Sequence, residues 1–248
     1  GGFRATLFHL GALRRLNELG VLHRVRTISS VSGGSLMALV LAAAIRKVGG
    51  ALTGPFPDFD AQVAKPTADL TSSNFRGRLL RRRLNPINFL RGREIVDHMA
   101  TLLAKDTSKL TLRELPSAPN FVFCATDMAF GVNWVFERQR MGDYQVGYHS
   151  PPPDDYPAGR AAAASACFPP LFNPLRTKFN ERDFKNGKCT HAETRKSCLS
   201  GLRLTDGGNY DNMGLEPVWK SHEIELVSDG GGAVEFTPDR RLKWRILP

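Results

Sequence analysis

Long apolar runs are missing from this sequence. The longest, residues 36–45, is about half of the ~20 residues that a transmembrane helix needs, so we expect no segment that crosses a membrane. No signal peptide is present, although the chain begins abruptly at Gly1 and a targeting segment upstream would escape notice. The compartment therefore stays open between the cytoplasm and a peripheral membrane location.

Cysteine is scarce, with 4 in 248 residues, and a chain of this length does not depend on a disulfide framework. Cys124 and Cys167 lie in apolar surroundings typical of small buried side chains. Cys189 and Cys198 flank a polar stretch typical of ordinary loop cysteines, and a local disulfide is the alternative there. The sequence has neither closely spaced cysteines nor an H-x-x-x-H pair, so we expect no metal site and no cofactor.

Internal repeats and low-complexity tracts are absent as well. Hydrophobic residues make up 42% of the chain and charged residues 23%, a balance typical of a folded domain with a sizeable core. One domain commonly reaches about 250 residues. We therefore predict a single domain over residues 1–248, with a surface excursion at residues 176–200.

Acidic residues are too few to balance the basic ones, which leaves a formal net charge of +10 and a pI near 9.8. Part of the excess lies between Arg76 and Arg93, where seven arginines are interleaved with leucine, isoleucine and phenylalanine. Such a mixture suits a segment lying on an anionic membrane surface, although a solvated basic helix and loop explains it equally well. We expect no nucleic-acid partner, because no RNP-like aromatic motif or zinc-ligand spacing accompanies the charge.

The first part of the chain alternates helix and strand. Leucines at positions 7, 10, 13 and 16 predict an amphipathic helix over residues 5–19. Residues 25–31 are rich in β-branched side chains and predict a buried strand, which Gly33-Gly34 interrupts before an apolar helix over residues 35–47. This order predicts an α/β domain with helices on both faces of its sheet.

Further elements are expected along the rest of the chain. Residues 50–75 contain three prolines and are typical of a loop. We predict two more strands that pair around a turn containing Gly131, at residues 120–126 and 132–137. The other predicted elements are helices over residues 94–104, 159–167 and around Val218 and Trp219, and strands over residues 202–205 and 223–227.

Ser32 is the candidate nucleophile. A serine hydroxyl needs a base to take its proton and donors to stabilise the charge that develops. A sharp turn from strand to helix lifts the serine Oγ above the sheet and leaves N–H groups and the positive helix end nearby. In Ser30-Val31-Ser32-Gly33-Gly34, Gly34 supplies the small residue after the serine, and Ser30 replaces the usual glycine before it. Helix capping by Ser32 is the structural alternative.

Two glycine-rich segments support the catalytic interpretation. Gly1-Gly2-Phe3-Arg4 begins a helix, where backbone N–H groups approach an oxyanion closely. A flexible terminus is the plain alternative there. Asp206-Gly207-Gly208 follows an apolar strand, which places a carboxylate at a strand end where it projects into a cleft. A simple Asp-Gly turn is the alternative for that segment.

In this order, the three segments resemble the motifs of the patatin-like phospholipases. Those motifs are a G-G-G-x-R/K-G oxyanion loop, a G-x-S-x-G elbow and a later D-G-G/A segment. Gly1 and Gly2 match the second and third glycines of the first motif and Arg4 its basic position, while Ala5 replaces its last glycine. Residues 164–170 also look like a family segment, and the similarity covers nearly the whole chain.

The resemblance implies a three-layer α/β/α fold with a mostly parallel central sheet, whose first strand would lie upstream of residue 1. It also implies a catalytic dyad without histidine, in which Ser32 attacks a lipid ester and Asp206 accepts its proton. The residues implied in the oxyanion hole are Gly1, Gly2, Gly33 and Arg4. The glycines implied in shaping the two turns are Gly34, Gly207 and Gly208. Phospholipid, lysophospholipid and neutral glyceride esters all fit such a site.

Three rival interpretations stay open. A Ser–Asp–His triad would use His222, which follows Asp206 in the order expected of α/β-hydrolases. A catalytically inactive, basic membrane-binding module would keep the same fold and hydrolyse nothing. An acyltransferase would pass the acyl group to an acceptor other than water.

Overall fold

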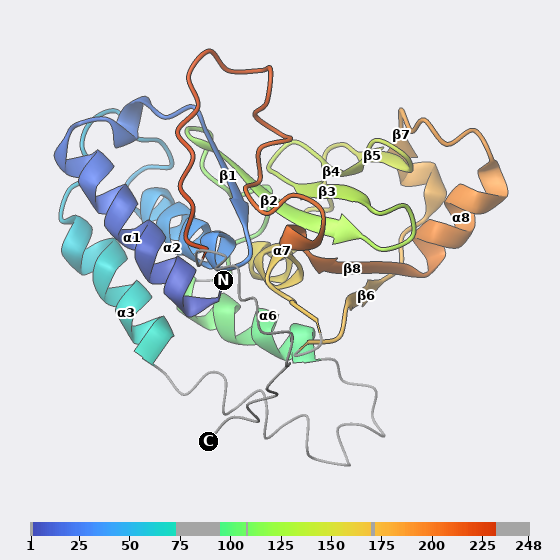
Figure 1. Cartoon of the computed structure of the whole chain (residues 1–248), viewed down its shortest axis with the longest axis horizontal. Helices are drawn as coiled ribbons and strands as arrows, with labels where there is room; N and C mark the ends of the chain where they lie inside the picture. Colours follow the sequence, from blue (N-terminus) through green and yellow to red (C-terminus); the bar gives the residue numbers. More distant parts are fainter. Residues whose placement is uncertain (1, 73–94, 108, 170–171, 232–248) are drawn as a thin grey trace, which may run out of the picture.

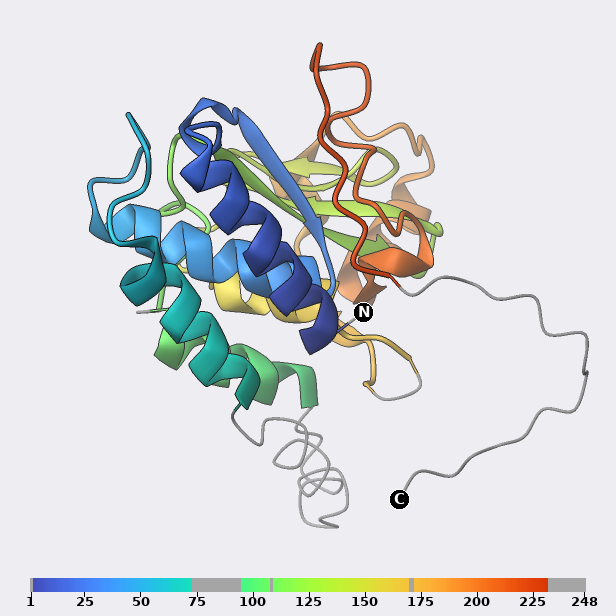
Figure 2. The ribbon, with the colours of Figure 1, turned by 60° about the vertical axis from the view of Figure 1, so that its left-hand side comes forward.

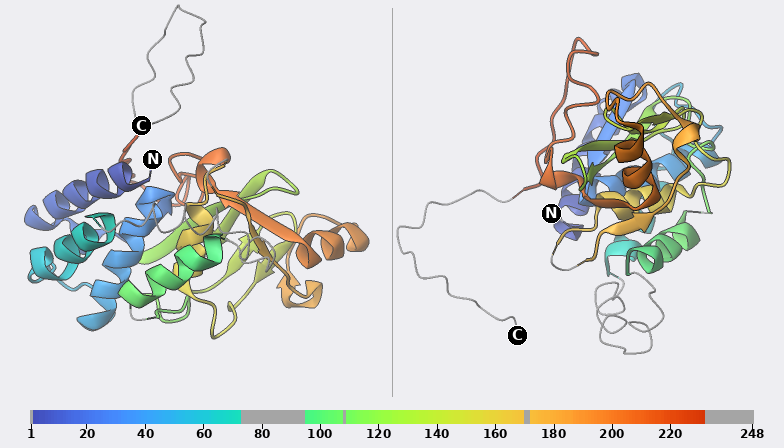
Figure 3. Two further views of the ribbon diagram at one scale, coloured as in Figure 1. Left: turned by 90° about the horizontal axis from the view of Figure 1, so that it is seen from below. Right: turned by 90° about the vertical axis from the view of Figure 1, so that its right-hand side faces the viewer.

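The computed structural model describes residues 2–72, 95–107, 109–169 and 172–231 (Figure 1). A curled sheet lies against a group of helices, with helix α8 at one end of the molecule and helices α1 and α3 at the other (Figure 3). The basic segment between Arg76 and Arg93 lies outside the described residues, as does Gly1. No helix within the described ranges is long and apolar enough to cross a bilayer.

Eight strands form one sheet in the described part of the chain. The spatial order is β6-β8-β2-β3-β4-β5-β7, and β1 also pairs with β2. β2 is therefore central, with β3 along one edge and both β1 and β8 along the other. The bounds are β1 (Thr27–Val31), β2 (Asn120–Asp127), β3 (Val132–Phe136), β4 (Met141–Asp143), β5 (Gly147–His149), β6 (Leu175–Thr177), β7 (Phe184–Lys185) and β8 (Leu202–Asp206).

The sheet is mostly antiparallel, so the predicted fold class, a three-layer α/β/α fold with a mostly parallel central sheet, is wrong in the direction of its strands. β1 and β2 are parallel, whereas the other six pairings among the described strands are antiparallel. The physical reason lies in the connections. Residues 128–131, 137–140 and 144–146 join successive strands, and parallel neighbours need a crossover of roughly a dozen residues or more.

Helices cover one face of this sheet. α2 (Gly33–Lys47) and α7 (Ala158–Ser165) pack directly on the strands. Residues 36–45 of α2 are all buried, which explains why this helix is apolar on every side. The helices that pack on α2 and α7 are α1 (Phe3–Glu18), α3 (Lys65–Ser72) and α6 (Ile95–Asp106).

The central strand β2 is buried on both faces. Phe121, Phe123 and Ala125 belong to the main core beneath the helices, while Val122 and Cys124 belong to a second cluster. Successive side chains of a strand point to opposite faces, so the second cluster lies on the face away from the helices. The apolar side chains of this second cluster also need a segment that shields them from water.

The segment 210–231, which contains neither helix nor strand, supplies this cover (Figure 2). It passes close to β1 at two places. A Cβ atom on Gly214 would lie 3.0 Å from Val31 Cγ2. Further along, the His222 Nε2 atom lies 3.0 Å from Thr27 Oγ1.

Most of the predicted helices and strands are confirmed to within about two residues at their ends. The helix expected around Val218 and the strand expected over residues 223–227 are wrong, because this segment forms the irregular cover. Residues 50–75 are also not a simple loop, since they contain the π-helical turn η2 (Asp60–Ala64) and α3. The excursion at residues 176–200 contains the short helix η3 (Glu181–Asp183), β7 and α8 (Ala192–Ser200).

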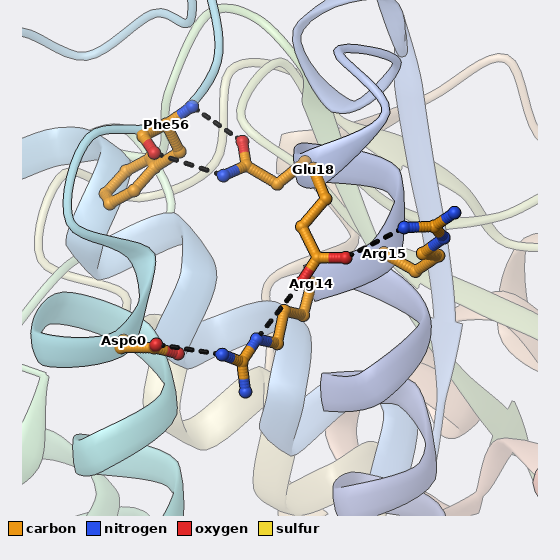
Figure 4. Close-up of polar contacts among 6 residues, drawn as sticks. Arg14, Arg15, Glu18, Phe56 and Asp60 are labelled. Carbon is orange, nitrogen blue, oxygen red and sulfur yellow. Dashed lines mark hydrogen bonds and ion pairs between the residues drawn. The ribbon is translucent and has the colours of Figure 1, made fainter.

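Polar contacts hold the C-terminal half of α1 against the segment that precedes α3 (Figure 4). Arg14 Nη2 donates to Asp60 Oδ2 over 2.9 Å, and Arg14 also pairs with Glu18 at 3.4 Å. The Asn17 side chain exchanges two hydrogen bonds with the Phe56 backbone, of 2.6 and 3.1 Å. These contacts join the C-terminal half of α1 to the segment that precedes α3.

Candidate active site

Ser32 occupies the turn between β1 and α2, where the sequence predicts it. Its backbone has φ 54° and ψ −122°, a combination that costs a residue other than glycine about 1–3 kcal/mol. Ser32 stands at the N-cap of α2, but its side chain makes no capping hydrogen bond. Helix capping therefore does not account for this serine, and its hydroxyl is left for another partner.

β1 and β8 meet end to end on one edge of β2, and this meeting brings Ser32 and Asp206 together. β1 runs parallel to β2 and ends with Val31 opposite Cys124. β8 runs antiparallel to β2 and ends with Asp206 opposite Ala125. Since Cys124 and Ala125 are consecutive, the chain leaving β1 at Ser32 arrives directly at the last residue of β8.

The Asp206 carboxyl is buried, with 2% of the residue exposed. Burial raises its pKa above the ordinary value, while hydrogen bonding from the Gly208 N–H and from the Ser32 side chain acts in the opposite direction. Oδ1 accepts the Gly208 N–H over 2.9 Å, and Oδ2 has no partner of full hydrogen-bond geometry among the described residues. The Ser32 hydroxyl thus lies near enough to influence the carboxyl but is not yet in ideal alignment. A carboxyl with a raised pKa and an unused oxygen is suited to accept a proton.

Ser165 supports the turn from inside the protein. This buried residue ends α7, and its Oγ accepts the Ser32 N–H over 3.0 Å and donates to the Cys124 carbonyl over 2.6 Å. Ser35 Oγ lies 2.8 Å from Ser165 Oγ and donates to Ser30 Oγ over 3.1 Å. The hydroxyl network therefore ties α2, α7 and the sheet to the strained turn.

The N-termini of α1 and α2 lie against each other beside Ser32. Thr6 Oγ1, on α1, donates to the Gly33 carbonyl over 2.8 Å. A Cβ atom on Gly33 would lie 2.1 Å from the Gly2 carbonyl oxygen, so only glycine fits at this position. Both helices begin without a side-chain cap, and the N–H groups of a first helical turn have no acceptor within the helix. Two positive helix ends therefore lie near Ser32, where they favour an anion.

Sequence reasoning missed Ser165 and Thr6 as site residues. Ser165 lies in the segment 164–170, and the family resemblance of that segment was the available signal. The partners of Ser165 come from β2 and from the turn before α2, which the sequence does not reveal. Thr6 carries no signal of its own, since it is a small polar residue within an amphipathic helix pattern.

The glycines around the two turns are constrained to different degrees. Gly207 packs against β2, where a Cβ atom would lie 2.3 Å from the Cys124 carbonyl oxygen. Gly34, in contrast, has room for a side chain, because its nearest neighbour would be His9 Cδ2 at 3.5 Å. Close backbone approach therefore demands glycine at position 207 but not at position 34.

Arg4 and Gly1 are not brought into the site by any described contact. Arg4 is exposed on the first turn of α1, and none of the ion pairs among the described residues includes it. Gly1 lies outside the described residues. The predicted oxyanion donors that the structure places next to Ser32 are therefore Gly2 and Gly33.

Neither histidine near this region completes a triad through described contacts. His222 contacts Thr27, at the start of β1, whereas Ser32 follows the end of that strand. At about 3.3 Å per strand residue, Thr27 and Ser32 are ~16 Å apart, which rules out direct proton transfer between His222 and Ser32. His9 lies closer, beside Gly34, and burial lowers its pKa. Within the described ranges, no group of three or more His, Cys, Asp or Glu side chains could hold a metal ion.

Comparison with known proteins gives a family match over most of the chain. A family model described as patatin-like phospholipase matches residues 1–219. No curated protein and no solved structure matches the chain. The matched range includes Ser32, Asp206 and all of the glycine-rich segments around them.

Proposed function

The chain belongs to the patatin-like phospholipase family, and on this premise we propose that it hydrolyses lipid acyl esters with Ser32 as nucleophile and Asp206 as base. Membership supports lipid acyl hydrolysis as the general activity and implies a lipid substrate. The observation that carries the specific proposal is the end-to-end meeting of β1 and β8, which puts a strained serine beside a buried carboxyl.

In the first step, Asp206 accepts the hydroxyl proton while Ser32 Oγ bonds to the ester carbonyl carbon. The tetrahedral intermediate then collapses, and the alcohol leaves with a proton returned from Asp206. In the second step, water loses a proton to Asp206 and attacks the acyl-enzyme. Release of the fatty acid returns the proton to Ser32. A base with a raised pKa holds the proton more readily during each step, which supports this role for Asp206.

We propose that backbone N–H groups at the starts of α1 and α2 stabilise the oxyanion. Gly33 is the first residue of α2, and it is pressed against Gly2 at the start of α1. Donors fixed in place before the reaction stabilise developing charge without reorganisation, an effect worth roughly 3–4 kcal/mol for one donor in other hydrolases. The proposal also keeps the roles expected of Gly1, as a further oxyanion donor, and of Arg4, as a supporting residue of the oxyanion hole.

The strained turn favours an enzyme over an inactive module of the same fold. A backbone conformation that costs stability persists where it serves a function, and binding to a membrane would not require it. We further propose that the basic residues between Arg76 and Arg93 bring the protein to an anionic lipid surface, in keeping with the net charge of +10.

The proposed function is tested by measuring fatty-acid release by the full chain from phosphatidylcholine, lysophosphatidylcholine and a short-chain p-nitrophenyl ester. Ser32→Ala and Asp206→Asn should each lower kcat/KM by about a thousandfold or more. His222→Ala and His9→Gln should retain most of the activity, because the dyad does not use them. Free fatty acid as the main product identifies hydrolysis, whereas an acylated acceptor identifies acyl transfer.

Two results would contradict the proposal. One is turnover by the wild type that persists in Ser32→Ala. The other is loss of turnover in His222→Ala or His9→Gln at unchanged thermal stability, which would favour a histidine-dependent mechanism instead.

A further inference from the structure

A cavity of about 310 Å³ lies in the excursion formed by η3, β7 and α8. These elements lie at one end of the molecule, whereas the N-terminus of α1, which borders Ser32, lies near its middle (Figure 1). The cavity is therefore separate from the candidate active site, and nothing in the proposed hydrolysis uses it.

The lining of this cavity is basic. Arg182, Lys185 and Arg195 line it from three successive elements, against a single acidic side chain, Glu181. The surrounding stretch, residues 176–196, contains seven basic and three acidic residues. Positive charge is therefore concentrated where the surface is hollow.

The three cationic side chains are not neutralised within the described structure. None of the ion pairs among the described residues includes Arg182, Lys185 or Arg195. The Arg195 guanidinium is oriented by a bond of 3.1 Å from Nη2 to the Phe184 carbonyl. Its Nε atom is buried and has no hydrogen-bond partner among the described residues. Because this atom is closed to solvent, an anion in the cavity would meet the lining cations through their other nitrogen atoms.

The backbone that shapes the cavity is held rigidly against the rest of the sheet. Gly187 packs on the turn after β4, where a Cβ atom would lie 2.5 Å from the Gln145 carbonyl oxygen. Asn186 adopts φ 62°, a left-handed conformation that asparagine tolerates. Hydrogen bonds from the N–H groups of Lys188 and Cys189 to the same turn, of 2.8 and 3.0 Å, fix this approach. The basic groups are therefore presented on a fixed frame.

We infer that this cavity is a binding site for a phosphate group, carried either by a lipid headgroup or by a small soluble molecule. A guanidinium fork and an ammonium together match the oxygens of a phosphate. The volume lies at the lower end of the range of ligand pockets, roughly 300–1,000 Å³, which suits a small phosphorylated group. Ala192, the first residue of α8, also lines the cavity, so the positive end of that helix adds to the attraction.

The test is calorimetric titration of the full chain with inorganic phosphate and with glycerol 3-phosphate, in buffer free of other oxyanions. Sedimentation with phosphatidylcholine vesicles, with and without phosphatidic acid, tests the lipid source. Arg182→Gln combined with Lys185→Gln should weaken binding about tenfold or more. The matched control, Lys178→Gln combined with Lys196→Gln, removes the same charge from exposed residues of the excursion that do not line the cavity. It should change binding less than about twofold.

Arg195→Lys separates geometry from charge, because it keeps the cation and removes the planar fork. It should weaken binding severalfold, and its melting temperature measures how much the lost bond to the Phe184 carbonyl contributes to stability. Ser32→Ala should bind phosphate as the wild type does, so this test is independent of the proposed hydrolysis. Dependence on Arg182 and Lys185 with soluble phosphates, with vesicles or with both supports the site and identifies the source. Absence of saturable binding in every arm, or equal loss in the matched control, would overturn it.

Discussion

At the scale of single residues, the conformation of Ser32 links activity to stability. Its φ of 54° and ψ of −122° suit glycine better than serine. Ser32→Gly should therefore raise the free energy of unfolding by about 1 kcal/mol relative to Ser32→Ala, because it relieves the strain that alanine keeps. Both variants should lose esterase activity. Urea denaturation of the two variants measures the difference, and a less stable glycine variant would argue against a strained turn.

The environment of Asp206 predicts a pH dependence. A base must be ionised to accept a proton, and burial raises the pKa of this carboxyl. kcat/KM should therefore fall as the pH decreases, with the midpoint above about 3.9, the ordinary value for aspartate. A pH–rate profile on a soluble ester measures this midpoint. A flat profile, or a midpoint that moves in His9→Gln, would show that another group is the base.

The sequence was sufficient to name Ser32 and Asp206 as candidates, because each lies in a short motif whose residue types suit the chemistry. It was not sufficient for Ser165, whose importance depends on a bond to the Ser32 N–H across the fold. Gly33 was predicted as an oxyanion donor. Its second constraint, close packing against Gly2, appears only when α1 and α2 lie together.

At the scale of elements, the direction of β8 decides where Asp206 lies. A parallel sheet would have gathered catalytic residues at the carboxyl ends of neighbouring strands. Instead, β1 and β8 share one edge of β2 and point toward each other. The hairpin signal at Gly131 already favoured an antiparallel pair, since a short turn cannot join parallel strands. The pairing of β8 with β2, about 80 residues apart in sequence, could not be predicted from local pattern.

The end of α7 offers a test of how the turn is held. Ser165→Ala removes the acceptor of the Ser32 N–H and the donor to the Cys124 carbonyl. It should lower the free energy of unfolding by about 1–3 kcal/mol, because buried groups lose their partners. kcat should fall more than KM rises. Ser35→Ala is the control, since the Ser35 side chain belongs to the network but does not bond to Ser32, and the backbone bond from the Ser35 N–H to the Ser32 carbonyl is kept. Equal losses of kcat in both variants would refute a positioning role specific to Ser165.

At the scale of the whole molecule, two further carboxyls are buried in the sheet, and both are distant in sequence from Ser32 and Asp206. Asp127 ends β2 and Asp143 ends β4, and both are fully buried. Burial raises the pKa of each carboxyl, and that of Asp143 to about 7. Asp143 Oδ1 accepts the N–H groups of Gln145 and Val146, over 2.7 and 2.8 Å. Cys198 Sγ donates to Asp127 Oδ2 over 3.6 Å.

This pair predicts how stability varies with pH. The folded protein keeps the Asp143 proton to a higher pH than the unfolded chain does, so the free energy of unfolding should fall as the pH rises from about 4 to about 7. Asp143→Asn cannot ionise and should melt at a higher temperature than the wild type at about pH 8, but not at about pH 5. Asp69→Asn, at an exposed position, is the control. A lower melting temperature for Asp143→Asn at the higher pH would contradict the assignment.

The division of the molecule into a helix-covered face and a loop-covered face was predicted only in part. The buried helix α2 and the amphipathic helix α1 followed from periodicity, which reports how each element is exposed. The cover at residues 210–231 did not, because its local patterns predicted a helix around Val218 and a strand over residues 223–227, whereas the segment runs irregularly along the sheet. The 176–200 excursion was predicted as a surface feature, whereas its basic cavity depends on the way η3, β7 and α8 fold back on the sheet.

The most direct measurement of the central claim is labelling of the full chain with a fluorophosphonate probe, followed by peptide mapping. If Ser32 is a nucleophile activated by Asp206, the adduct should lie on Ser32 and be absent in Ser32→Ala. The labelling rate should drop by about a hundredfold or more in Asp206→Asn. It should stay near the wild-type rate in His222→Ala. An adduct on another serine, or a labelling rate that does not depend on position 206, would contradict the account.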